Sequence, residues 1–187
     1  MTKTLIVPGS ARRDSGNRKL ARVVADVASE AGLEPTLIDL ADFPMPLSDG
    51  DLEAASGLPE HAFRLKALMA SHPAWVFVAP EYNASMTPLL KNAIDWASRP
   101  APGEAALATF QAKTAALFSA SPGALGGMRA LVQLRLCLTA VRVLVVPDDF
   151  SLNGADPAFD EAGALRDPKH RATVRRVLDR LAAATPA

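Results

Sequence analysis

Apolar residues in the chain form short unbroken runs, which alternate with stretches where they recur every three or four positions. Residues 5–7 and 74–79 are continuous runs, as in strands that are buried on both faces of a parallel sheet. Leu20, Val23 and Val27 instead show the spacing of one helix face. The pattern predicts strands at residues 5–7, 35–40, 74–79, 113–118 and 142–146, and helices at 20–31, 59–69, 88–97, 131–138 and 168–184.

This alternation of strands and helices predicts a single doubly wound α/β domain over residues 1–187. Its five parallel strands are expected in the flavodoxin-like order 2-1-3-4-5, with helices on both faces of the sheet. Ligands of such folds bind beyond the carboxyl ends of the strands, where the strand order reverses. The loops after the first, third and fourth strands are therefore expected to share one crevice.

The loop at residues 9–17 joins the first strand to the first helix and has the chemistry of a phosphate site. Backbone N–H groups at a helix N-terminus have no partner within the helix, and together with the helix dipole they favour an anion. Ser10 and Ser15 add hydroxyl groups, and Asn17 adds an amide donor. Arg12 could grip a phosphate through two parallel hydrogen bonds, and Arg13 could serve instead.

The same loop also fits an ordinary strand-to-helix turn, in which Ser15 only caps the helix and both arginines point into water. It lacks the Gly-Lys-Ser/Thr ending of a Walker A loop and the Gly-x-Gly-x-x-Gly of a dinucleotide fold. If the loop holds a phosphate, a mononucleotide is the expected ligand.

Two further loops are expected at the same edge of the sheet. Residues 80–83, Pro-Glu-Tyr-Asn, follow the third strand directly, and Thr87 and Pro88 then fit the first positions of a helix. Residues 119–127 follow the fourth strand and are small and glycine-rich, so the backbone can approach a ligand closely there.

Two long segments have no strong periodic pattern. Residues 42–57 are rich in Pro, Asp, Gly and Ser and are long enough to line a site. Residues 147–168 also lack a regular pattern, and they are interpreted as a site-lining or interface segment with a short hairpin at residues 159–165.

Composition narrows the class of partner. The 20 Lys and Arg balance the 20 Asp and Glu, so neither a nucleic-acid surface nor a strongly acidic docking protein is indicated. No apolar run approaches the length that spans a membrane, and the single cysteine fits a reducing compartment, so a cytoplasmic protein with a small-molecule partner is expected. The three histidines lie too far apart to predict a metal site, and Cys137 is interpreted as a small buried hydrophobe.

Several motifs together resemble the NADPH-dependent FMN reductase family, a flavodoxin-like group that includes quinone, chromate and azo-dye reductases. The resemblance spans nearly the whole chain. In this sequence Ala84 stands where a glycine often follows the asparagine of the family motif. The motifs are Gly9-Ser10-x-Arg12 with Ser15-x-Asn17, Pro80-Glu81-Tyr82-Asn83, Leu90-Lys91-Asn92-Ala93-Ile94-Asp95-Trp96, the loop at 119–127 and Phe159-Asp160-Glu161-x-Gly163-x-Leu165.

The resemblance implies that FMN is the cofactor. The loop at 9–17 would bind its phosphate, residues 80–83 would run along the isoalloxazine and ribityl groups, and the loop at 119–127 would close the far side of the ring. The residues expected to bind the cofactor are Ser10, Arg12, Ser15, Gly16, Asn17, Pro80, Glu81, Tyr82, Asn83, Ser119, Gly123 and Gly126.

The resemblance also implies the reaction. Hydride would pass from NADPH or NADH through flavin N5 to flavin, quinone or another small acceptor by a ping-pong mechanism, with no catalytic side chain. Arg13 and Arg99 are candidates for the 2′-phosphate of NADPH. Asp95 and Trp96 fit either core packing or an interface from the sequence alone, and the resemblance favours an interface, since relatives form homodimers that often pair into homotetramers.

An electron carrier of the flavodoxin type is the alternative function, since it would bind FMN without oxidising a nicotinamide. The neutral net charge argues against a carrier, which usually presents an acidic docking face. A third possibility is an α/β domain that binds another phosphorylated metabolite.

Overall fold

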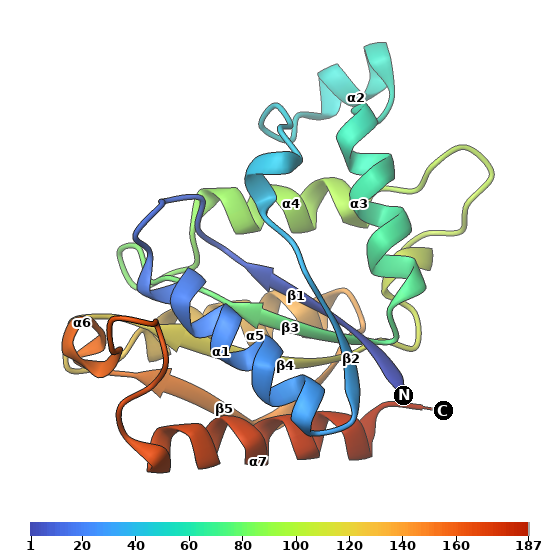
Figure 1. Ribbon diagram of the computed structural model, residues 1–187. Helices are drawn as coiled ribbons and strands as arrows, with labels where there is room; N and C mark the ends of the chain where they lie inside the picture. Colours follow the sequence, from blue (N-terminus) through green and yellow to red (C-terminus); the bar gives the residue numbers. More distant parts are fainter. Residues whose placement is uncertain (187) are drawn as a thin grey trace.

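Five parallel strands form one sheet in the order β2-β1-β3-β4-β5, as the sequence predicts (Figure 1). The computed structural model describes residues 1–186. The three central strands are almost wholly buried, which explains their unbroken apolar runs. The strands are β1 (Thr2–Pro8), β2 (Leu33–Leu37), β3 (Ala74–Val78), β4 (Thr114–Ala120) and β5 (Leu144–Leu152).

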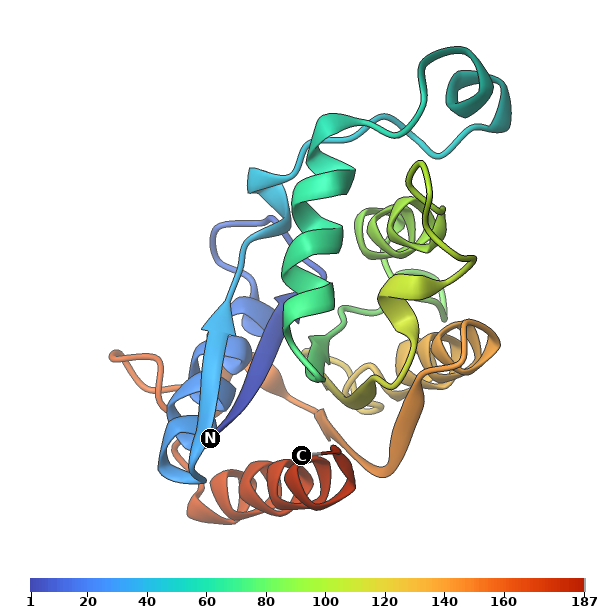
Figure 2. The same cartoon turned by 90° about the vertical axis from the view of Figure 1, so that its right-hand side faces the viewer.

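Two layers of helices cover the sheet (Figures 1 and 2). Helices α1 (Gly16–Glu30) and α7 (Pro168–Ala184) pack on one face, where Ile6 and Phe118 point toward them. Helices α3 (Glu60–Ser71), α4 (Pro88–Ser98) and α5 (Met128–Ala140) pack on the other face against Leu5 and Trp75. Successive strand residues therefore serve opposite cores. The shorter elements are η1 (Leu40–Asp42), α2 (Gly50–Ser56), η2 (Ala108–Phe110) and α6 (Ala155–Ala158).

The helix starts follow the capping residues. Thr87 accepts the backbone N–H of Leu90 at 3.3 Å, and Pro88 is the first residue of α4, as predicted. Asp167 caps α7 in the same way. Pro59 is the residue before α3 and not part of its first turn, so that helix starts one residue later than expected.

The end of the sheet differs most from the sequence prediction. The fifth strand does not stop at residue 146 but continues to Leu152, so the first part of the segment 147–168 is regular. A register shift between β4 and β5 accommodates Pro147, which cannot donate to the ladder and lies on an edge strand. Arg135 donates to the carbonyl of Val146 at 2.7 Å and so stabilises the bulge.

Other segments also differ from their predicted bounds or contents. The second strand runs from Leu33 to Leu37 and not over 35–40, because the chain turns into η1 after it. The segment 42–57 contains the helix α2. Asp49 caps this helix, because its side chain accepts the backbone N–H groups of Asp51 and Leu52. The hairpin at 159–165 is present, with Phe159 paired to Leu165 in an antiparallel bridge.

Candidate functional site

Three loops at the carboxyl edge of the sheet are tied to one another by side chains and form the candidate crevice. Thr87 lies before α4, and its hydroxyl donates to the carbonyl of Gly9 at 2.6 Å, which joins the first loop to the loop after β3. Asn17 joins the start of α1 to the end of β4. Glu81 binds Arg129 at the start of α5 and so joins the second loop to the third. The sequence interpretation saw Thr87 only as a helix cap and did not single out Arg129.

The first loop leaves a helix N-terminus without a side-chain cap. Ser15 occupies the capping position of α1 and is buried, but its hydroxyl makes no capping hydrogen bond, and the first turn carries no acidic residue. Ser10 is also buried, and its hydroxyl accepts the backbone N–H of Arg12 at 3.3 Å. The side chains of Arg12 and Arg13 are exposed beside it. Two buried hydroxyls, an uncapped helix and nearby guanidinium groups suit a phosphate.

The side chain of Asn17 forms hydrogen bonds to β4, whereas the sequence suggested its amide as a donor to a phosphate. Its Nδ2 donates to the carbonyl of Ala120 at 2.7 Å, and its Oδ1 accepts the backbone N–H of Ala120 at 2.9 Å. The side chain is buried and both of its polar atoms are engaged. This contact uses one of the two N–H groups of Nδ2, and the backbone N–H of Asn17 in the first turn of α1 is a second group that it can offer to a phosphate.

Residues 82–85 form a tight two-residue turn at the crevice. The backbone N–H and carbonyl groups of Tyr82 and Ser85 pair at 2.9 and 3.0 Å. Both central residues are left-handed, with φ of 50° at Asn83 and 63° at Ala84. Such turns favour glycine at the second position, so Ala84 is strained. Tyr82 is 54% exposed, and its ring can offer an aromatic surface to a ligand.

Glu81 directs its carboxylate to Arg129 at the start of α5. The side chain is 8% exposed, and its oxygens accept the Nε of Arg129 at 2.6 Å and the Arg129 backbone N–H at 3.2 Å. The residue before α5 is Gly127, which has no side chain for capping. Glu81 therefore caps this helix from another loop, and the Arg129 guanidinium is held at the rim of the crevice.

The third loop is shaped by Ser119 and Gly126. Ser119 is fully buried, and its hydroxyl donates to the carbonyl of Gly126 at 2.6 Å. A Cβ on Gly126 would lie 2.9 Å from backbone atoms of Ser151 and Leu152, and φ is 61°, so glycine is required there. Ser119 thus fixes the loop and does not present its hydroxyl to a ligand. Gly123 lies further along the loop, where its N–H donates to Ser121.

Two residues weighed from sequence do not lie in the crevice. Arg99 follows the C-terminus of α4, the end opposite Thr87, and its Nε donates to Glu53 at 2.8 Å. Trp96 is fully buried, and its indole N–H donates to the carbonyl of Pro46 at 2.7 Å, so its role is core packing.

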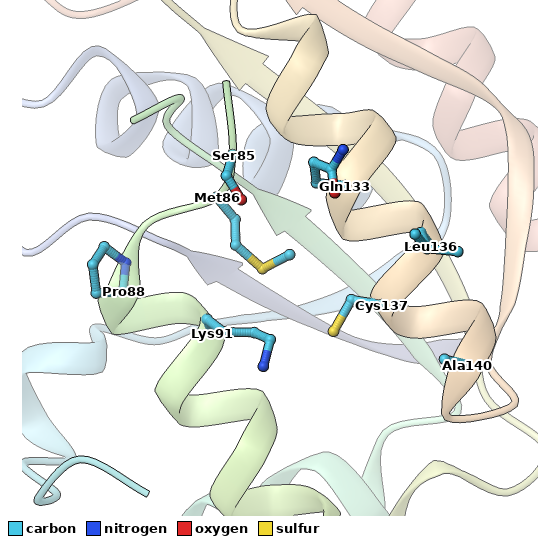
Figure 3. Close-up of a pocket in the computed structure, with 8 residues that line it drawn as sticks. All are labelled: Ser85, Met86, Pro88, Lys91, Gln133, Leu136, Cys137 and Ala140. Atoms are coloured by element: carbon cyan, nitrogen blue, oxygen red, sulfur yellow. The ribbon is translucent and has the colours of Figure 1, made fainter. Parts of the chain in front are cut away.

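A groove of about 420 Å³ runs between α4 and α5, beside the turn at residues 82–85 (Figure 3). Met86 and Leu136 line it with Cys137, which is partly buried and not the fully buried residue expected. Burial raises the pKa of the Cys137 thiol, and the nearby Lys91 ammonium opposes that shift. A hydrogen bond to Asp95 raises the pKa of Lys91.

Neither a metal site nor a membrane-spanning helix is found within residues 1–186. No group of three or more His, Cys, Asp or Glu side chains in this range could hold a metal ion. No helix among these residues is long and apolar enough to cross a membrane.

The family model for NADPH-dependent FMN reductase matches residues 2–157, and the chain belongs to this family. The predicted family, enzyme class and cofactors are thereby confirmed: the chain is an NAD(P)H-dependent oxidoreductase with FMN as its cofactor.

Two curated relatives are similar in sequence to this chain over almost their whole length. A quinone reductase from Pseudomonas putida strain KT2440 is 36% identical over 179 residues, which cover 95% of this chain and 91% of the relative. An NAD(P)H-dependent FMN reductase from Pseudomonas aeruginosa, PA1204, is 37% identical over 183 residues, covering 96% and 92%.

A solved structure is similar over the whole fold. The flavoenzyme NAD(P)H:(acceptor) oxidoreductase FerB from Paracoccus denitrificans superposes with a TM-score of 0.79 at 29% identity, and the match covers 98% of this chain and 99% of that one. The predicted flavodoxin-like fold is confirmed.

Proposed function

We propose that the chain oxidises NAD(P)H and reduces flavin, quinone or another small acceptor by a ping-pong mechanism at the crevice described above. The observation that carries the proposal is the uncapped N-terminus of α1, with buried Ser10 and Ser15, facing a crevice whose three loops are locked together. Quinone is favoured among the acceptors because several relatives are named quinone reductases.

The residues of the first loop fit the phosphate of FMN. The backbone N–H groups of Gly16 and Asn17 lie in the uncapped first turn of α1, where an anion is stabilised. Ser10 and Ser15 add hydroxyl groups. Arg12 is exposed to solvent, and its guanidinium adds a positive charge that can bind the phosphate.

The other two loops fit the ring of FMN. The backbone N–H groups of Glu81 and Asn83 and the exposed ring of Tyr82 would lie beside it, and Gly123, which has no side chain, would allow a close approach on the far side. Gly126 would contribute by shaping that loop, because its missing Cβ leaves room for the backbone of Ser151 and Leu152. FMN, when bound, supplies the hydride chemistry at N5. The protein groups then bind and orient, so we assign no catalytic side chain, and Tyr82 and Asn83 shape the pocket.

The choice of nicotinamide depends on cations near the crevice. Arg13 is exposed in the loop at residues 9–17, and we propose that it binds the 2′-phosphate of NADPH. Arg99 is not proposed for this role, because it binds Glu53 at the C-terminal end of α4.

We also propose a homodimer, or a homotetramer built from homodimers, in the cytoplasm. Met128, Val132 and Leu136 follow one another at four-residue spacing on α5, and all three are exposed. An exposed apolar stripe of this kind is typical of a protein interface. The single cysteine supports a reducing compartment.

The experiment that tests the function is an absorbance spectrum of the FMN-reconstituted protein, followed by anaerobic addition of NADPH and then NADH. Flavin bands that bleach within seconds support the reductase and rank the two nicotinamides. Bands that persist would instead indicate an electron carrier, and a protein that gains no bands would refute the flavin site. Initial rates at several quinone concentrations give parallel double-reciprocal lines if the mechanism is ping-pong.

A further inference from the structure

A pocket of about 300 Å³ lies beside α1, where this helix meets the hairpin at residues 159–165 and the start of α7. Figure 1 shows the segment between α6 and α7 next to the first half of α1. The tip of the hairpin, residues 162–164, forms one wall of the pocket. The charged residues that line it are Lys19, Arg22, Asp26 and Arg171.

Two of the three cations in this pocket have no partner. The side chains of Lys19 and Arg22 form neither an ion pair nor a hydrogen bond within residues 1–186. Arg171 is different, because it binds Glu30 at 2.5 Å and so ties α7 to α1. Lys19 and Arg22 are therefore available to an anion that enters the pocket.

The acid of the pocket is also left unpaired in the part of the chain that the structure describes. Arg22 and Asp26 lie four residues apart on α1, a spacing that allows an ion pair on a helix surface. Arg175 and Asp179 have the same spacing on α7 and pair at 2.7 Å. Arg22 and Asp26 instead line the pocket separately, so it presents positive and negative groups at the same time.

A ligand that suits such a pocket has an anionic group and hydrogen-bond donors. Guanidinium and ammonium groups bind phosphate well. The carboxylate of Asp26 can only accept hydrogen bonds, so it suits the hydroxyl groups of a sugar. None of the large exposed apolar side chains of residues 1–186 lines the pocket, which favours a soluble ligand over a lipid surface.

The pocket is separate from the candidate site for the FMN phosphate, although both involve α1. The N–H groups proposed for FMN lie at Gly16 and Asn17, in the uncapped first turn of the helix. The pocket instead uses side chains that continue along the helix from Lys19 to Asp26. None of the residues expected to bind FMN lines it.

We propose that this pocket binds the phosphate ester of a sugar, as a second ligand site apart from the crevice. Lys19 and Arg22 bind the phosphate, and Asp26 accepts hydrogen bonds from the sugar hydroxyl groups. Arg171 stays bound to Glu30 and adds positive potential at the wall of the pocket. The ligand then joins α1 to the hairpin and to the start of α7.

Calorimetric titration of the FMN-loaded protein with ribose 5-phosphate tests this site, because FMN then occupies the loop at residues 9–17. We expect saturable binding of one ribose 5-phosphate per chain at concentrations up to about 10 mM. The affinity should fall as sodium chloride is added, since salt screens exposed charges. A ligand that binds only the folded protein should also raise its Tm.

The variant Arg22→Gln removes a charge from the pocket, and Arg176→Gln is the matched control. Both arginines are exposed on helices and unpaired within residues 1–186, but Arg176 does not line the pocket. We expect Arg22→Gln to weaken ribose 5-phosphate binding about tenfold through the loss of a charged hydrogen bond, and Arg176→Gln to change it less than about twofold. Neither variant should alter NADPH oxidation, because neither side chain lies at the crevice.

The variant Asp26→Ala tests which part of the ligand the acid contacts. Inorganic phosphate has no sugar, so its affinity should rise when the like charge of Asp26 is removed. Ribose 5-phosphate gains in the same way but loses a hydrogen bond to the carboxylate. The ratio of the ribose 5-phosphate affinity to the phosphate affinity should therefore fall about fivefold. An unchanged ratio would overturn the assignment of a sugar to this pocket.

Three other results would overturn the site itself. They are an FMN-loaded wild type that shows no saturable binding, an Arg22→Gln variant that binds as well as the wild type, and binding seen only in the FMN-free protein. The last result would place the phosphate in the loop at residues 9–17. The proposed function is tested separately by the flavin spectrum, and a protein that binds ribose 5-phosphate but fails to bleach its flavin would refute that function alone.

Discussion

Replacing Asn17 with alanine removes the side chain that joins the start of α1 to the end of β4. Two hydrogen bonds, of 2.7 and 2.9 Å, are lost, and both backbone polar groups of the buried Ala120 are left without these partners. Each unsatisfied buried group costs about 1 to 3 kcal/mol. Because the site borders the crevice and water can replace part of the loss, we expect Asn17→Ala to lower the free energy of unfolding by about 3 kcal/mol. For a chain of this size that corresponds to a fall of about 6 to 12 °C in Tm.

The assay is urea unfolding of the FMN-free protein, followed by circular dichroism, with Arg13→Ala as the control. Arg13 is exposed in the same loop, and its removal should change the free energy of unfolding by less than about 0.5 kcal/mol. The FMN-free protein is essential, because it separates two roles of Asn17. If the amide acted on the phosphate and not on Ala120, the FMN-free variant would be as stable as the wild type and only its FMN affinity would fall. That result would refute the reasoning.

Three further predictions concern the crevice and the groove beside it. Arg12→Ala should weaken FMN binding by about 1.5 to 3 kcal/mol in a fluorescence titration, the range for a charged hydrogen bond, and unchanged affinity would remove Arg12 from the site. Ala84→Gly should leave the free energy of unfolding unchanged or raise it by up to about 1 kcal/mol, because the left-handed strain at φ 63° is relieved while the unfolded chain gains freedom; a clear loss in thermal unfolding would contradict this. Because burial raises the pKa of Cys137, its thiolate forms at higher pH than that of a free thiol, so alkylation by iodoacetamide should be slower than for free cysteine at pH 8 and should rise steeply above it.

The sequence was most informative where local chemistry dictates structure. Thr87 and Pro88 specify a helix start by themselves, since one supplies a capping hydroxyl and the other has no N–H to satisfy. The course of the fifth strand was not predictable in this way. Pro147 indicates a strand end in the sequence, whereas in the structure a register shift accommodates it and Arg135, from the preceding helix α5, donates to the carbonyl of Val146.

The roles of the polar residues in the crevice were decided by contacts between distant segments. Asn17, Glu81 and Ser119 have the right chemistry to bind a ligand, but each directs its side chain to a neighbouring loop. Their partners are Ala120, Arg129 and Gly126, and for Asn17 the partner lies 103 residues away, so no spacing in the sequence could reveal it.

The sequence by itself determined the order of strands and helices and the family to which the chain belongs, and it predicted the edge of the sheet at which the candidate site lies. These follow from hydrophobic periodicity and short loop motifs, which act over a few residues. The tertiary structure decided which polar groups remain free at the crevice and left the short helix α2 without a buried residue. Hydrogen bonds and burial depend on what lies across space, and that is settled only when the chain has folded.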